Sequence, residues 1–168
     1  MNARLLRIFT LLFFLIGLFY APASLSATKR KCYKEVQDFL ILQFGESFQQ
    51  DENIVRVSVI DTKLIMVVDK TPTVNPSRYF FYNEKNDGSA CLVLTTRLAN
   101  DVDFSKIMIN GVPIEITTRS AGQGSDDVTI QYKWMPSKRV YMPASCARGV
   151  GVRKKSASCK DIYSKFGQ

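Results

Sequence analysis

The segment 146–159 places basic side chains between two cysteines and is the strongest candidate for a binding site in this sequence. Its cations are Arg148, Arg153, Lys154 and Lys155. A disulfide across the segment would hold them on one projecting loop, and closing a loop of about 14 residues contributes ~3 kcal/mol in the chain-entropy model. Gly149 and Gly151 let backbone N–H groups approach an anion, and Arg forks suit phosphate or carboxylate. The segment predicts an anion-binding loop; the alternative is a solvated loop whose glycines serve a turn.

The charge of the chain is concentrated at its end. Residues 133–168 contain nine Lys or Arg and a single acid, Asp161, whereas residues 28–132 contain 12 Lys or Arg and 14 Asp or Glu. This asymmetry indicates a local anionic contact rather than general solubility. We therefore add Lys138 and Arg139 to the predicted binding residues. Their neighbours Tyr132, Trp134 and Tyr141 resemble a platform for single-stranded nucleic acid, but alternation along 128–134 already explains two of these aromatics as core residues.

Composition excludes several kinds of catalysis. The chain has no histidine, so Ser-His-Asp, Cys-His and His-ligated metal mechanisms are excluded. The cysteine spacing contains no Cys-x-x-Cys pair, and we expect no metal and no cofactor. The closest acidic pairs, Asp101 with Asp103 and Asp126 with Asp127, lie in predicted loops, where Asp commonly serves turns.

Residues 1–27 have the pattern of a secretory signal. Arg4 and Arg7 precede an apolar run at 8–20, and Pro22 with small residues follows it. We expect cleavage after Ala23, Ser26 or Ala27 and a single globular domain over 28–168. An uncleaved membrane anchor is the alternative. The protein is thus predicted to be periplasmic or secreted, with no transmembrane segment in the mature chain.

All four cysteines follow this signal, and an even number in an exported chain indicates two disulfides. Three connectivities are possible. We predict Cys146–Cys159, because these two are close in sequence and flank glycines, and Cys32–Cys91 as the remaining pair.

The hydrophobic pattern predicts an α+β fold, with an N-terminal helix packed on an antiparallel sheet of about six or seven strands. Apolar residues recur at helical spacing over 32–44. The predicted strands are 55–59, 64–68, 78–83, 90–98, 106–109, 112–118 and 128–134. Asn86-Asp87-Gly88 and Asn110-Gly111 predict hairpin turns. After a short strand at 140–142, the segment 146–159 is expected to be a loop and 161–166 a short helix.

Together these observations predict an exported, non-enzymatic domain that contacts an anionic envelope or host component, or a protein partner, through its basic C-terminal segment. The first alternative is an inhibitor or accessory factor that presents the 146–159 loop to an exported enzyme. The second is a small carboxylate-dependent hydrolase. We expect no nucleic-acid partner, whereas contact with a membrane surface fits the charge. No asparagine begins a glycosylation sequon, which favours a bacterial source.

Overall fold

The computed structural model describes residues 31–46, 55–61, 63–71, 76–121, 127–150 and 153–165. The predicted signal peptide, its three candidate cleavage points, Gly151 and Asp126 lie outside the described residues. Within the described part of the chain, no helix is both long and apolar enough to span a membrane.

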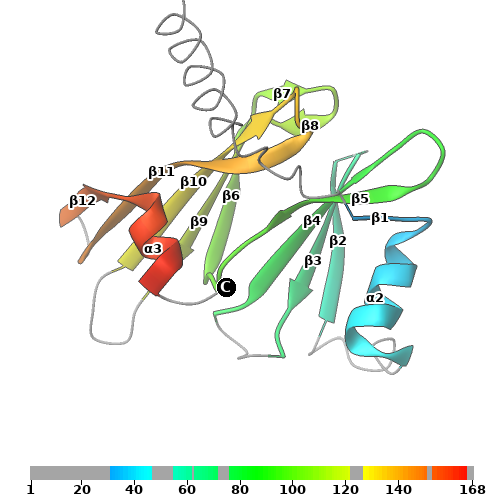
Figure 1. Cartoon of the computed structure of the whole chain (residues 1–168), viewed down its shortest axis with the longest axis horizontal. Coiled ribbons are helices and arrows are strands. Elements are labelled where there is room, and N and C mark those ends of the chain that lie inside the picture. The colour runs from blue at the N-terminus through cyan, green and yellow to red at the C-terminus, as the bar shows by residue number, and fades with distance from the viewer. Residues whose placement is uncertain are drawn as a thin grey trace, which may run out of the picture.

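Antiparallel strands make up most of the structure and form three sheets. The first sheet has the order β1 (Cys32–Tyr33), β5 (Ala90–Thr95), β4 (Arg78–Glu84), β3 (Leu64–Asp69), β2 (Val55–Asp61). The second has the order β12 (Arg153–Ala157), β11 (Val140–Val150), β10 (Asp127–Met135), β9 (Glu115–Ser120), β6 (Asp101–Phe104). The third is a small hairpin of β7 (Met108–Ile109) and β8 (Val112–Pro113). The helices are α2 (Val36–Phe44) and α3 (Cys159–Lys165); Figure 1 shows α3 against the second sheet and α2 beside the first.

The predicted α+β class, a helix packed on one sheet of six or seven strands, is wrong. The chain is mostly β, its strands fall into three sheets, and α2 is only nine residues long. The error has two main sources. Residues predicted as a C-terminal loop form β12 and the last five residues of β11, and Asp101–Phe104 forms a strand that the sequence pattern did not indicate.

The main hydrophobic core joins the two large sheets. Leu64, Phe81 and Leu94 from the first sheet share one cluster with Ile116 and Tyr132 from the second. Alternation places Val128, Ile130, Tyr132 and Trp134 of β10 inward, because residues two apart on a strand face the same side. The lone tryptophan is therefore mostly a core residue.

A smaller core lies on the other side of the first sheet. Phe39 of α2 packs its ring 5.0 Å from that of Tyr82 and 5.2 Å from that of Phe80, centroid to centroid. The helix begins at Val36, after a capping box in which Glu35 and Asp38 exchange hydrogen bonds with each other's backbone. The four residues before it include β1, so the predicted helix 32–44 began too early. The Cys32–Cys91 disulfide joins β1 to β5.

Candidate functional site

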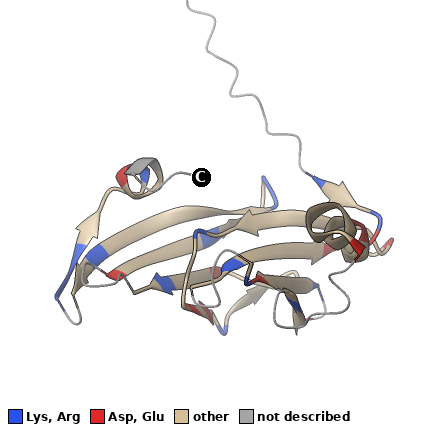
Figure 2. Ribbon diagram, turned by 90° about the horizontal axis from the view of Figure 1, so that it is seen from below, with Lys and Arg blue, Asp and Glu red and all other residues tan. Residues whose placement is uncertain are grey.

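The predicted anion-binding loop is a β-hairpin rather than a loop. β11 and β12 pair from Cys146 opposite Ala157 to Val150 opposite Arg153. This pairing continues the second sheet by one strand and makes β12 its edge. A loop over 146–159 was therefore a wrong prediction, although the cations do lie at an end of the molecule, as Figure 2 shows by the Lys and Arg colouring.

The register of this hairpin sorts the four predicted cations onto two faces. Arg148 lies directly opposite Lys155, and Arg153 lies two residues from Lys155, so the three share one face. We call these three residues the basic face. Lys154 is on the opposite face, where its Nζ donates a 2.8 Å hydrogen bond to the hydroxyl of Thr129 on β10. The structure thus brings three of the four cations together.

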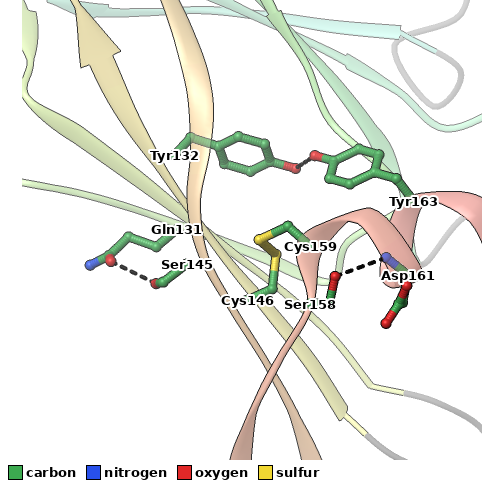
Figure 3. The surroundings of a disulfide bond; sticks show 8 residues. All are labelled: Gln131, Tyr132, Ser145, Cys146, Ser158, Cys159, Asp161 and Tyr163. Carbon is green, nitrogen blue, oxygen red and sulfur yellow. Dashed lines mark hydrogen bonds between the residues drawn. A yellow bond between two sulfur atoms is a disulfide. The ribbon is translucent and has the colours of Figure 1, made fainter.

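A disulfide anchors the basic face to the terminal helix. Cys146 of β11 is joined to Cys159, the first residue of α3, and Cys32 to Cys91, as the sequence predicted. Figure 3 shows the Cys146–Cys159 bond where β11 meets the start of α3. At the same point the backbone N–H of Asp161 donates to the hydroxyl of Ser158, 3.4 Å away. The predicted short helix at 161–166 corresponds to α3.

A second contact between α3 and the sheet is a pair of tyrosines. The hydroxyl of Tyr163 donates to that of Tyr132 at 2.8 Å (Figure 3). Burial raises the pKa of Tyr132 above its ordinary value. Burial also lowers the pKa of Arg97, whose charge acts on both tyrosines. This cluster holds α3 in place, and the hairpin is consequently fixed at its base.

The two other predicted cations are far from the basic face. Lys138 and Arg139 lie in the turn between β10 and β11, at the opposite end of β11 from Arg148. Arg139 and Arg148 are nine positions apart along an extended chain, a distance of about 30 Å. The six predicted binding residues therefore do not form one site. Three lie on the basic face, two lie in the turn between β10 and β11, and Lys154 lies on the opposite face of the hairpin.

Arg139 lines a cavity of about 450 Å³ that sequence reasoning missed. Its other charged lining residues are Lys63, Glu84 and Lys85, and Trp134 contributes an aromatic ring. These residues come from different turns, of which the sequence pattern predicted those at Asn86-Asp87-Gly88 and Asn110-Gly111. A cation, Lys63, Lys85 or Arg139, marks three of the turns in the sequence, whereas the Asn110-Gly111 turn has none beside it.

Of the two acidic pairs, only Asp101 with Asp103 lies wholly within the described residues. Asp101 and Asp103 lie on the outer face of β6, where Asp103 makes a 2.6 Å ion pair with Arg119 of β9. Both partners of this ion pair are about half exposed. The described residues contain no group of three or more Cys, Asp or Glu side chains arranged to hold a metal ion.

No family model matches the chain, and neither a curated protein nor a solved structure shows significant similarity to it. The function proposed below therefore rests on the residues and the geometry alone.

Proposed function

We propose that this chain is an exported, non-enzymatic interaction domain that binds an anionic surface or protein partner through the basic face of the β11–β12 hairpin. The observation that carries the proposal is the register that places Arg148 directly opposite Lys155. Like charges opposite each other on neighbouring strands are destabilising. An anion bound across this face would interact with all three cations at once.

The composition of the hairpin supports the same function. Neither β11 nor β12 contains Asp or Glu, and Arg153, Lys154 and Lys155 are all exposed. Arginine forks bind phosphate and carboxylate oxygens in pairs, and lysine adds a point charge. Lysines on an edge strand also prevent unwanted pairing with other chains. This protective role requires charge on the edge strand but not on one particular face. Removing cations from the opposite face is therefore a suitable control for binding through the basic face.

Export is supported by two features. The two disulfides are consistent with an oxidising, exported location. The basic, apolar and small-residue order of residues 1–27 is the pattern of a secretory signal.

One observation favours an inhibitor or accessory factor as the second candidate. The hairpin is held at its base by the Cys146–Cys159 bond and by the Tyr132–Tyr163 hydrogen bond. A sheet edge that is fixed in this way loses little conformational entropy on binding, which suits contact with an acidic surface of an enzyme.

The test compares two double variants that each remove two cations. Arg153→Ser with Lys155→Ser alters the basic face, and Lys133→Ser with Lys154→Ser removes exposed cations from the opposite face of the same sheet. Binding is measured on heparin resin and on phosphatidylcholine vesicles with and without phosphatidylglycerol. We expect the first variant to elute at much lower salt and to lose the vesicles, and the control to bind nearly as the parent protein does.

Equal losses in both variants would contradict the proposal, because they would reflect net charge alone. Salt separates the two candidates. Binding to a surface through exposed charge should decline steeply as salt rises, whereas a shaped interface with an enzyme partly persists. Thermal melting confirms that both variants are folded, since surface substitutions usually change stability by about 0.5 kcal/mol or less.

A further inference from the structure

Four turns meet at the end of the molecule opposite the basic face and line a half-open cavity of about 450 Å³. The turns are those that precede β3, join β4 to β5, join β7 to β8, and join β10 to β11. A cavity of this volume is in the range that accommodates small-molecule ligands. The turns come from all three sheets, as do the loops that form many binding sites on rigid β scaffolds.

The cavity lining combines three kinds of chemistry. Lys63, Lys85 and Arg139 supply positive charge against the single carboxylate of Glu84. Asparagine side chains of the lining, including Asn110, offer amide donors and acceptors. Trp134 adds the face or edge of an aromatic ring. The excess positive charge favours an anionic ligand. The amides and the carboxylate can bind hydroxyl groups of that ligand, and the aromatic ring can pack against the apolar C–H face of a ring-shaped ligand.

Backbone strain is concentrated at the same cavity. Asn110 and Arg139 have φ values of 54° and 49°, and no other non-glycine residue in the described ranges has positive φ. Asn110 is explained by its Asn-Gly turn, in which this conformation is favoured. Arg139 closes the four-residue turn between β10 and β11, in which its N–H donates to the carbonyl of Pro136 at 3.3 Å, and it holds a left-handed conformation for which glycine is the usual choice. Strained residues of this kind cluster at binding sites.

The walls of the cavity are fixed before any ligand arrives. The backbone N–H of Trp134 donates to the carbonyl of Ile114 at 2.9 Å, and its indole packs edge to face on Tyr141 with the centroids 5.0 Å apart. The hydroxyl of Tyr141 donates in turn to the carbonyl of Pro113 at 2.6 Å. On the other side, the N–H of Glu84 donates to the carbonyl of Lys63 at 2.8 Å. Preorganisation of this kind lowers the entropic cost of binding.

We infer that this cavity binds an acidic saccharide, a sugar ring that carries a carboxylate. Arg139 and the two lysines neutralise the carboxylate, Glu84 and the asparagines bind ring hydroxyls, and Trp134 contacts the ring. The inference is independent of the basic face, because no residue of that face lines the cavity.

Trp134 provides the readout, since it is the only tryptophan in the chain and it lines the cavity. Its fluorescence is followed while the protein is titrated with sodium galacturonate, with sodium glucuronate, and with galactose and glucose as neutral counterparts of the same ring size. Sodium acetate tests a carboxylate without a ring, and sodium chloride keeps the ionic strength constant. We expect a saturable change with at least one uronate, and affinities at least tenfold weaker for its neutral counterpart and for acetate.

Arg139→Gly separates binding from folding. This variant removes the guanidinium and also relieves the left-handed backbone, so we expect uronate affinity to fall by about tenfold or more while the melting temperature stays equal or rises. The matched control is Lys138→Ser, which removes an exposed cation from the same turn outside the cavity and should bind as the parent does.

Three results would overturn the inference: no saturable response to either uronate, equal affinity for the uronates and their neutral counterparts or acetate, or full uronate binding by Arg139→Gly. The Arg153→Ser, Lys155→Ser variant should retain uronate binding. Failure at the cavity is therefore distinguishable from failure of the basic face.

Discussion

Tyr163 on α3 donates a 2.8 Å hydrogen bond to Tyr132 on β10, across 31 residues of sequence. Tyr132 is fully buried in the core that joins the two large sheets. The bond and the neighbouring Cys146–Cys159 disulfide both connect α3 to the second sheet, the former through β10 and the latter through β11. The position of the β11–β12 hairpin relative to the core thus depends on a hydrogen bond and a disulfide, which can be removed one at a time.

The first prediction concerns this hydrogen bond. Tyr163→Phe removes the donor with little change in shape and should lower the free energy of unfolding by about 1 kcal/mol, the usual value for one intramolecular hydrogen bond. Urea unfolding of Tyr163→Phe, Tyr132→Phe and the double variant measures the coupling between the two hydroxyls. Strictly additive effects would mean that the bond does not contribute to stability.

The second prediction concerns the two disulfides. In the chain-entropy model a bond contributes more when it closes a longer loop. Replacing both cysteines of the Cys146–Cys159 pair by Ser, across a sequence separation of 13, should cost about 3 kcal/mol. The same change at Cys32–Cys91, across a separation of 59, should cost about 4 kcal/mol. Denaturant midpoints of the two double variants provide the comparison, and a larger loss at Cys146–Cys159 would contradict the entropic origin.

Local patterns in the sequence predicted those elements whose side chains alternate clearly. The alternation over 128–134 corresponds to β10, and the Asn110-Gly111 signal corresponds to the turn between β7 and β8, in which both residues have positive φ. These features follow from neighbouring residues alone. They were therefore accessible without knowledge of the rest of the fold.

The C-terminal strands were missed because their partners lie elsewhere in the chain. Proline disfavours the middle of a long strand, yet Pro143 lies opposite Tyr132 beside a register irregularity, where the ladder tolerates a missing N–H donor. β12 is polar along its whole length, which suits an edge strand and also resembles a loop. The cavity was missed for the same reason, because its lining is assembled by tertiary contacts between separate turns.

The third prediction concerns Gly149, which the sequence interpretation assigned to anion contact. In the structure a Cβ at this position would overlap the backbone carbonyl of Arg153 on β12. The close approach of the two strands therefore requires glycine here. Gly149→Ala should push β11 and β12 apart, weaken the pairing between them and lower the melting temperature by several degrees.

Hydrogen exchange of the amides of β12 locates the effect, which should be confined to the hairpin. The control is Gly88→Ala, at a glycine whose added Cβ meets no atom within 4 Å although its φ is positive. That variant should add only backbone strain at its own turn and leave β12 protected. Unchanged protection of β12 in Gly149→Ala would contradict the predicted overlap.

The last prediction concerns stability at alkaline pH. Tyr82, Tyr132 and Tyr141 are almost wholly buried, and burial raises the pKa of each above the ordinary value of 10. Because the folded state keeps these hydroxyls protonated while the unfolded chain ionises near pH 10, the stabilisation is complete below pH 10 and is lost as pH rises further. Above pH 10, each of these tyrosines should make the free energy of unfolding fall more steeply with pH, by up to about 1.4 kcal/mol per pH unit.

Tyr82→Phe tests this decline at a single residue. The Tyr82 hydroxyl is buried and has no hydrogen-bond partner among the described residues, so its removal should leave stability at pH 8 equal or slightly higher. Above pH 10 the variant should lose stability less steeply than the parent, because one buried group no longer has to ionise on unfolding. Urea midpoints measured from pH 8 to pH 11 compare the two slopes, and parallel curves would show that Tyr82 does not contribute to alkaline unfolding.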